Sequence, residues 1–80
     1  MKAEDMFKEL GYKKEICNLE IIYSKDYENN PNNYKCVCFN IYNKTFSVYE
    51  VDNYDGYVKV VDIYFELLQA INKQVKELGW

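Results

Sequence analysis

The sequence predicts one domain of the α+β class, spanning residues 1–80, in which two helices cover one face of an antiparallel sheet. Three observations lead to this prediction. Apolar residues recur every three or four positions over residues 62–80, which is the period of a helix with one buried stripe. Apolar and mixed residues alternate over residues 34–42 and again over 45–51, as in paired strands. A shorter helical pattern occupies residues 3–10.

Both predicted helices end on the same short motif. Lys-Glu-Leu-Gly is followed by an aromatic residue at positions 8–12 and again at 76–80. A glycine after a helix takes the left-handed conformation at little cost, and the next residue packs back onto the last turn. We therefore expect Tyr12 to contact Phe7 and Trp80 to contact Val75.

Four segments between the helices have strand character, so we expect a meander of three or four strands. The clearest two are 34–42 and 45–51, joined by a two-residue turn at Asn43-Lys44 that would place Ile41 opposite Phe46. A further strand is predicted over 19–25 and a short last strand over 57–61. Residues 26–33 contain four Asn and the only Pro, a composition typical of a loop.

The last helix is the longest periodic stretch and is predicted to begin at a cap on Asp62. Its expected apolar stripe consists of Tyr64, Leu67, Leu68, Ile71, Val75 and Leu78. One such stripe can cover one sheet face, and the first helix needs the same face to bury its own apolar side. The opposite sheet face is therefore expected to lack a helix.

Composition excludes several classes of function. The net charge of −3 and the isoelectric point of about 4.9 argue against general affinity for nucleic acid or anionic membranes, which requires a cationic surface. No run of apolar residues is long enough to span a bilayer. Glu4 and Asp5 stand where a signal peptide carries cations, so a cytoplasmic protein is expected.

No catalytic, metal-binding or cofactor-binding residues are predicted. The chain has no His, the commonest general base and metal ligand, and no glycine-rich phosphate loop. Cys36 and Cys38 would lie on one face of a strand about 7 Å apart, which suits neither a disulfide nor a complete metal site. With Cys17 they are interpreted as reduced thiols. Cys36 and Cys38 are expected to pack as small half-buried apolar residues, the alternative being a metal or redox role. Glu50, Asp52 and Asp55 lack the spacing of a calcium loop.

Tyr34, Tyr42 and Tyr49 are the candidate contact residues. The predicted pairing places them together on the sheet face opposite Phe39 and Phe46. Three interpretations are open: a solvated face stabilised by cross-strand pairs, a protein-contact face, or a platform on which nucleic-acid bases stack. Base stacking would need nearby cations, and only two lysines are close, namely Lys35 and Lys44.

The two chain ends carry the motifs MFKELGY at residues 6–12 and AINKQVKELGW at residues 70–80. In these motifs the chain resembles a family of short phage and prophage proteins from low-GC Gram-positive bacteria. This resemblance implies an accessory or host-interaction protein and brings no activity, catalytic residue or cofactor. The predicted function is a non-enzymatic protein that contacts an unidentified protein or a second copy of itself. The alternative is a nucleic-acid-associated accessory protein of phage DNA metabolism, and an enzyme ranks third.

Overall fold

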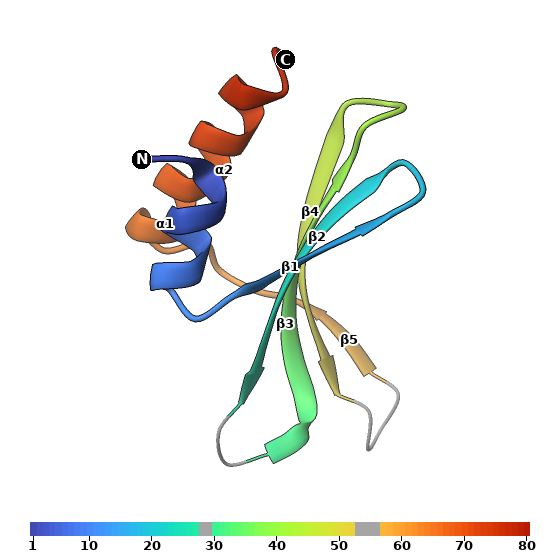
Figure 1. Cartoon of the computed structure of the whole chain (residues 1–80). Coiled ribbons are helices and arrows are strands. Elements are labelled where there is room, and N and C mark those ends of the chain that lie inside the picture. Colours follow the sequence, from blue (N-terminus) through green and yellow to red (C-terminus); the bar gives the residue numbers. More distant parts are fainter. Residues whose placement is uncertain (28–29, 53–56) are drawn as a thin grey trace.

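The computed structural model describes residues 1–27, 30–52 and 57–80 (Figure 1). This part of the chain forms two helices and five strands: α1 (Ala3–Glu9), β1 (Lys13–Cys17), β2 (Glu20–Tyr27), β3 (Asn30–Asn40), β4 (Thr45–Asp52), β5 (Tyr57–Val60) and α2 (Phe65–Glu77). No helix among these residues is both long and apolar enough to cross a membrane.

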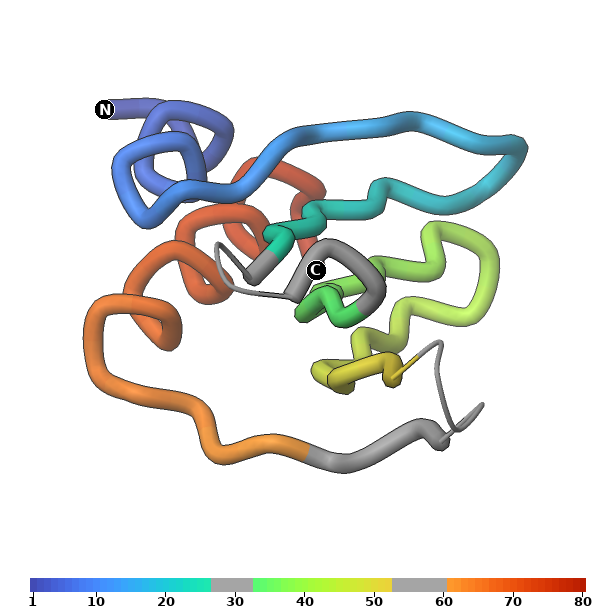
Figure 2. The backbone as a smooth tube through the Cα atoms, turned by 90° about the horizontal axis from the view of Figure 1, so that it is seen from below, coloured from blue at the N-terminus to red at the C-terminus, as the bar shows by residue number. Residues whose placement is uncertain are grey.

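The strands form one antiparallel sheet in the order β1-β2-β3-β4-β5, and both helices pack on the same face (Figures 1 and 2). The predicted α+β meander is therefore confirmed. The additional strand is β1, which the sequence analysis left unassigned. All five of its residues are exposed, because β1 is an edge strand, and its sequence therefore shows no alternation of apolar and polar residues.

An aromatic cluster joins the helices to the sheet. The ring of Phe7 on α1 stacks on Tyr23 of β2, with centroids 3.8 Å apart, and both side chains are fully buried. The edge of Phe39 on β3 meets both rings. Leu67, Ala70 and Ile71 of α2 complete this core. A small domain has few such residues, so each contributes a large share of its stability.

The core-facing side of α2 differs from the predicted stripe. Tyr64 and Leu68 are exposed to solvent, whereas Ala70 and Gln74 are buried. Gln74 can lie in the core because its Oε1 accepts a hydrogen bond from the Tyr23 hydroxyl at 2.5 Å, which satisfies a buried polar group. The predicted cap at Asp62 is wrong as well. The helix begins at Phe65, so the cap position is Tyr64, two residues after Asp62, and no side chain caps the helix.

Both helix stops form as predicted. Gly11 and Gly79 have positive φ angles of 92° and 75°. After α1, the Tyr12 N–H donates to the Phe7 carbonyl, and the two rings meet edge to face. After α2, the Trp80 N–H donates to the Val75 carbonyl. The indole ring packs near Phe39, so the second stop also anchors α2 to the sheet.

Gly79→Ala should lower the free energy of unfolding by about 1 kcal/mol, since alanine is strained at positive φ. Space is not the reason, because no atom outside Gly79 and its two chain neighbours lies within 4 Å of the position that the added Cβ would take. Urea denaturation measures the loss. Gly79→Asn is the control and should cost less, because Asn tolerates this conformation better. Equal stability of wild type and the alanine variant would contradict the capping role.

The β3–β4 hairpin has a longer connection than predicted. Asn40 pairs with Thr45, and Phe39 with Phe46, so each residue of β3 pairs two positions away from the prediction, and a four-residue connection, 41–44, joins the strands. Side chains stabilise this turn: Asn40 Oδ1 accepts the Asn43 N–H, and the Thr45 hydroxyl donates to Asn43 Oδ1. Since the shift is an even number of residues, the face predicted for each strand residue is retained.

The loop predicted over residues 26–33 is largely strand. β2 continues to Tyr27 and β3 begins at Asn30, with a register irregularity at Asp26/Tyr27; residues 28–29 lie outside the described chain. Pro31 is tolerated because β3 extends here beyond its last pair with β4, Asn33 with Asp52, so no ladder bond to β4 is lost.

Candidate functional site

The structure brings together two of the three candidate contact tyrosines. Tyr34 and Tyr49 lie on the sheet face away from the helices, on neighbouring strands, and both are half-buried. Tyr42 instead lies in the β3–β4 turn and is 82% exposed. The wider turn causes this separation, because it removes Tyr42 from the strand that was expected to align it with the other two. These three residues therefore do not form one surface.

Tyr34 and Tyr49 border a shallow hollow of about 370 Å³ on the open sheet face. Its other lining residues come from three strands: Glu15, Ile22, Ser24, Asp26 and Cys36. The floor is formed by Cys36, which is only 3% exposed. The hollow combines carboxylates, hydroxyls and one thiol, so its chemistry depends on whether that thiol is reactive.

The buried thiols are protonated at neutral pH. Burial raises the pKa of Cys36, although a hydrogen bond with Tyr49 partly opposes the effect. Burial and a hydrogen bond to Glu20 raise the pKa of Cys38 to about 12, and its Sγ donates to Glu20 Oε2 at 2.6 Å. The same Cys36 contact and burial raise the pKa of Tyr49. Since the thiolate is the nucleophilic form of cysteine, neither buried thiol is activated for catalysis.

Cys36 and Cys38 are buried, as the packing interpretation expects, whereas Cys17 is exposed. Over residues 1–27, 30–52 and 57–80, no group of three or more Cys, Asp or Glu side chains could hold a metal ion together. Of the acidic residues considered for calcium, Glu50 lies opposite Lys35 on the helix-covered sheet face. Asp55 lies outside the described residues.

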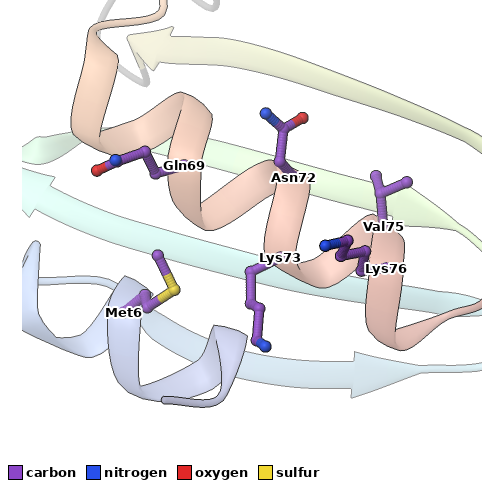
Figure 3. A pocket seen from close by; sticks show the side chains of 6 residues that line it. All are labelled: Met6, Gln69, Asn72, Lys73, Val75 and Lys76. Atoms are coloured by element: carbon purple, nitrogen blue, oxygen red, sulfur yellow. The ribbon is translucent and has the colours of Figure 1, made fainter.

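A second depression, of about 590 Å³, lies beside the two helices (Figure 3). Its lining residues are Met6, Gln69, Asn72, Lys73, Val75 and Lys76. Their polar groups do not converge, because Asn72 and Lys73 point to opposite sides of α2 in the view of Figure 3. A binding pocket requires a few polar groups aimed at one point, so this depression is a solvated trough between helices.

One group of exposed apolar residues lies where the two hairpins turn, and another lies at the start of α2. Ile16, Ile21, Phe39 and Phe46 form one row across four strands on the helix-covered face. The inner two are buried, whereas Ile16 is 69% and Phe46 43% exposed. The two turns also adjoin each other, since the Ile41 N–H donates to the Leu19 carbonyl at 2.8 Å. Figure 1 shows both turns extending away from α2.

We call this surface the hairpin-end patch and define it by five exposed apolar residues: Ile16, Leu19, Ile41, Tyr42 and Phe46. Sequence reasoning missed it, although one signal was present: Leu19 directly follows the turn residue Asn18, and Tyr42 directly precedes Asn43. Turns are normally polar, so apolar residues next to them indicate a surface with a use. The signal was overlooked because β1, which carries Ile16, was not predicted as a strand.

Comparison with known proteins does not extend this picture. The sequence matches no protein-family model, no curated protein and no solved structure at a significant level.

Proposed function

We propose that this chain is a small non-enzymatic protein that works by binding another protein through the hairpin-end patch. The observation that supports this proposal is the exposure of five large apolar side chains, three in two adjoining turns and two on the strands next to them. Soluble proteins seldom expose apolar residues in such a group unless the group binds something. The resemblance of the chain ends to phage and prophage proteins favours an accessory or host-interaction role.

The character of the patch favours protein over nucleic acid. Protein interfaces have an apolar, aromatic centre with a polar rim, and here Asn18, Asn43 and Thr45 lie beside the apolar residues. Binding of nucleic acid through phosphates needs several cations, and the β3–β4 turn supplies only Lys44. The open-face hollow supports no competing enzymatic proposal, because its thiol is buried and not activated.

The test compares tagged wild type with Leu19→Ser/Tyr42→Ser in pull-downs from lysate of a low-GC Gram-positive host. Both side chains lie outside the core, so the variant should fold normally. We expect one or more proteins to be retained by wild type and reduced at least tenfold with the variant, as for loss of central interface residues.

Ile63→Ser/Phe65→Ser is the matched control, since it removes two exposed apolar side chains away from the hairpin turns. It should retain the same proteins as wild type. Equal retention by wild type and the patch variant would contradict the role of the patch. Retention of short single-stranded DNA by wild type, lost in high salt, would instead support the nucleic-acid alternative.

A further inference from the structure

The hollow on the open sheet face is bordered by groups that attract an organic cation. Among the described residues that line it, two are acidic, Glu15 and Asp26, and none is basic. Lys13 shares this face of β1 with Glu15, but its side chain lines a separate hollow beside α1. The two carboxylates therefore give the open-face hollow a negative potential, which attracts cations and repels anions.

One end of the hollow combines a carboxylate with two aromatic rings. Asp26 on β2 lies directly opposite Tyr34 on β3. Tyr49 on β4 lies opposite Cys36 and therefore diagonal to Tyr34, at a spacing that aromatic side chains can bridge. A hydrogen bond between the Tyr49 hydroxyl and the Cys36 thiol holds this ring at the hollow. Tyrosine rings and a carboxylate together attract an ammonium group, through the ring quadrupole and the opposite charge.

The second carboxylate lies at the other end of an elongated floor. Glu15 pairs with Ile22, which precedes Asp26 by four residues on β2. At about 3.3 Å per residue and about 4.8 Å between strands, the Cα atoms of Glu15 and Asp26 are about 14 Å apart. The floor between them is formed by Ile22, Ser24 and Cys36. This spacing suits an apolar chain with a cation at each end.

We propose that the open-face hollow binds a linear aliphatic diamine, a chain of methylene groups with an ammonium ion at each end. One ammonium group lies beside Asp26 and the two tyrosine rings, and the other contacts Glu15. The methylene groups lie on Ile22 and Cys36, which offer apolar contact. The inference does not rest on the proposed function, because the hollow lies on the sheet face opposite the row that contains Phe46.

Titration of the full chain with amines, followed by NMR in low-salt buffer, tests the site. Diaminobutane and diaminooctane carry the same two charges, so general attraction to a chain of net charge −3 treats them alike. We expect diaminooctane to bind roughly threefold or more tightly, because only the longer chain reaches both carboxylates. Octylamine has the same chain but one charge, and it should also bind more weakly than diaminooctane.

The ring resonances of Tyr34 and Tyr49 report where the amine binds. Both should shift as diaminooctane is added and reach a plateau together. Saturable binding that leaves both rings unshifted would place the site elsewhere and overturn the inference. Equal affinities for diaminobutane, diaminooctane and octylamine would overturn it as well.

Substitution of single carboxylates separates this site from general charge attraction. Glu15→Gln and Asp26→Asn should each weaken binding of diaminooctane roughly threefold, about the worth of one exposed ion pair. Both side chains are exposed, so the variants should fold normally. Glu66→Gln is the matched control, because it removes the same charge from the exposed first turn of α2, and it should leave the Kd unchanged. An equal loss with all three variants would overturn the inference.

Discussion

Phe39→Ala should remove a large part of the free energy that stabilises the folded protein. The side chain is fully buried. The centroid of its ring lies no more than 6.3 Å from the ring centroids of Phe7, Tyr23, Phe46 and Trp80. Removing a buried phenylalanine costs about 3 to 5 kcal/mol. The free energy of unfolding of a domain of 80 residues is about 4 to 12 kcal/mol. The substitution therefore removes a large share of this free energy.

Urea denaturation followed by circular dichroism measures this effect, with Phe46→Ala as the matched control. Phe46 lies directly opposite on β4 and contacts the same ring, but it is 43% exposed. The control should therefore cost about 1 kcal/mol, in line with partial burial. Phe39→Leu keeps most of the volume and provides a folded variant for a measurable transition. Similar losses for the two alanine variants would contradict the central position of Phe39.

Tyr23→Phe should destabilise the protein by about 1 to 3 kcal/mol, although it removes a single oxygen atom. The hydroxyl donates to Gln74 Oε1 in the core, and Gln74 is only 4% exposed. The variant leaves a buried amide without this partner. The double variant Tyr23→Phe/Gln74→Leu removes the unsatisfied group as well, so it should recover most of the loss. Thermal or urea unfolding of the three proteins decides the matter, and a double variant less stable than Tyr23→Phe would contradict the explanation.

The same tyrosine should make the stability of the folded protein fall with rising pH in the alkaline range. Burial, with the nearby Glu4 and Glu77, raises the pKa of Tyr23 from 10.0 to about 12. Between these values the unfolded chain releases a proton that the folded chain retains, so unfolding becomes more favourable as the pH rises. The stabilisation is complete below pH 10 and lost towards pH 12. The free energy of unfolding of Tyr23→Phe should therefore fall less steeply with pH in this range than that of wild type. A fall due to the raised pKa of the buried Cys38 remains in both proteins.

The sequence by itself determined the features that depend on local chemistry. Both helix stops form where the Lys-Glu-Leu-Gly-aromatic motif occurs, since positive φ at Gly11 and Gly79 and the following backbone bond involve only neighbouring residues. The faces of β3 and β4 were also predictable, because alternation assigns Phe39 and Val37 to the buried side irrespective of which residues they oppose.

The register of the β3–β4 pairing could not be predicted from this alternation. A shift of two residues preserves every face, so alternation cannot distinguish the predicted pairing of Ile41 with Phe46 from the observed pairing of Phe39 with Phe46. Hydrogen bonds of the turn, from Asn43 and Thr45, and the bond from Ile41 to Leu19 in another hairpin select the observed one. That choice moved Tyr42 out of the expected contact face and into the hairpin-end patch.

Tertiary structure alone decided which side of α2 enters the core and which surface is left apolar. Gln74 is buried because Tyr23, 51 residues away, satisfies its amide, and no local pattern contains that information. β1 exists because β2 offers an edge to pair with, not because Lys13–Cys17 has a strand pattern of its own. Only this pairing aligns Ile16 with Phe46 across the sheet and creates the surface through which we expect the protein to act.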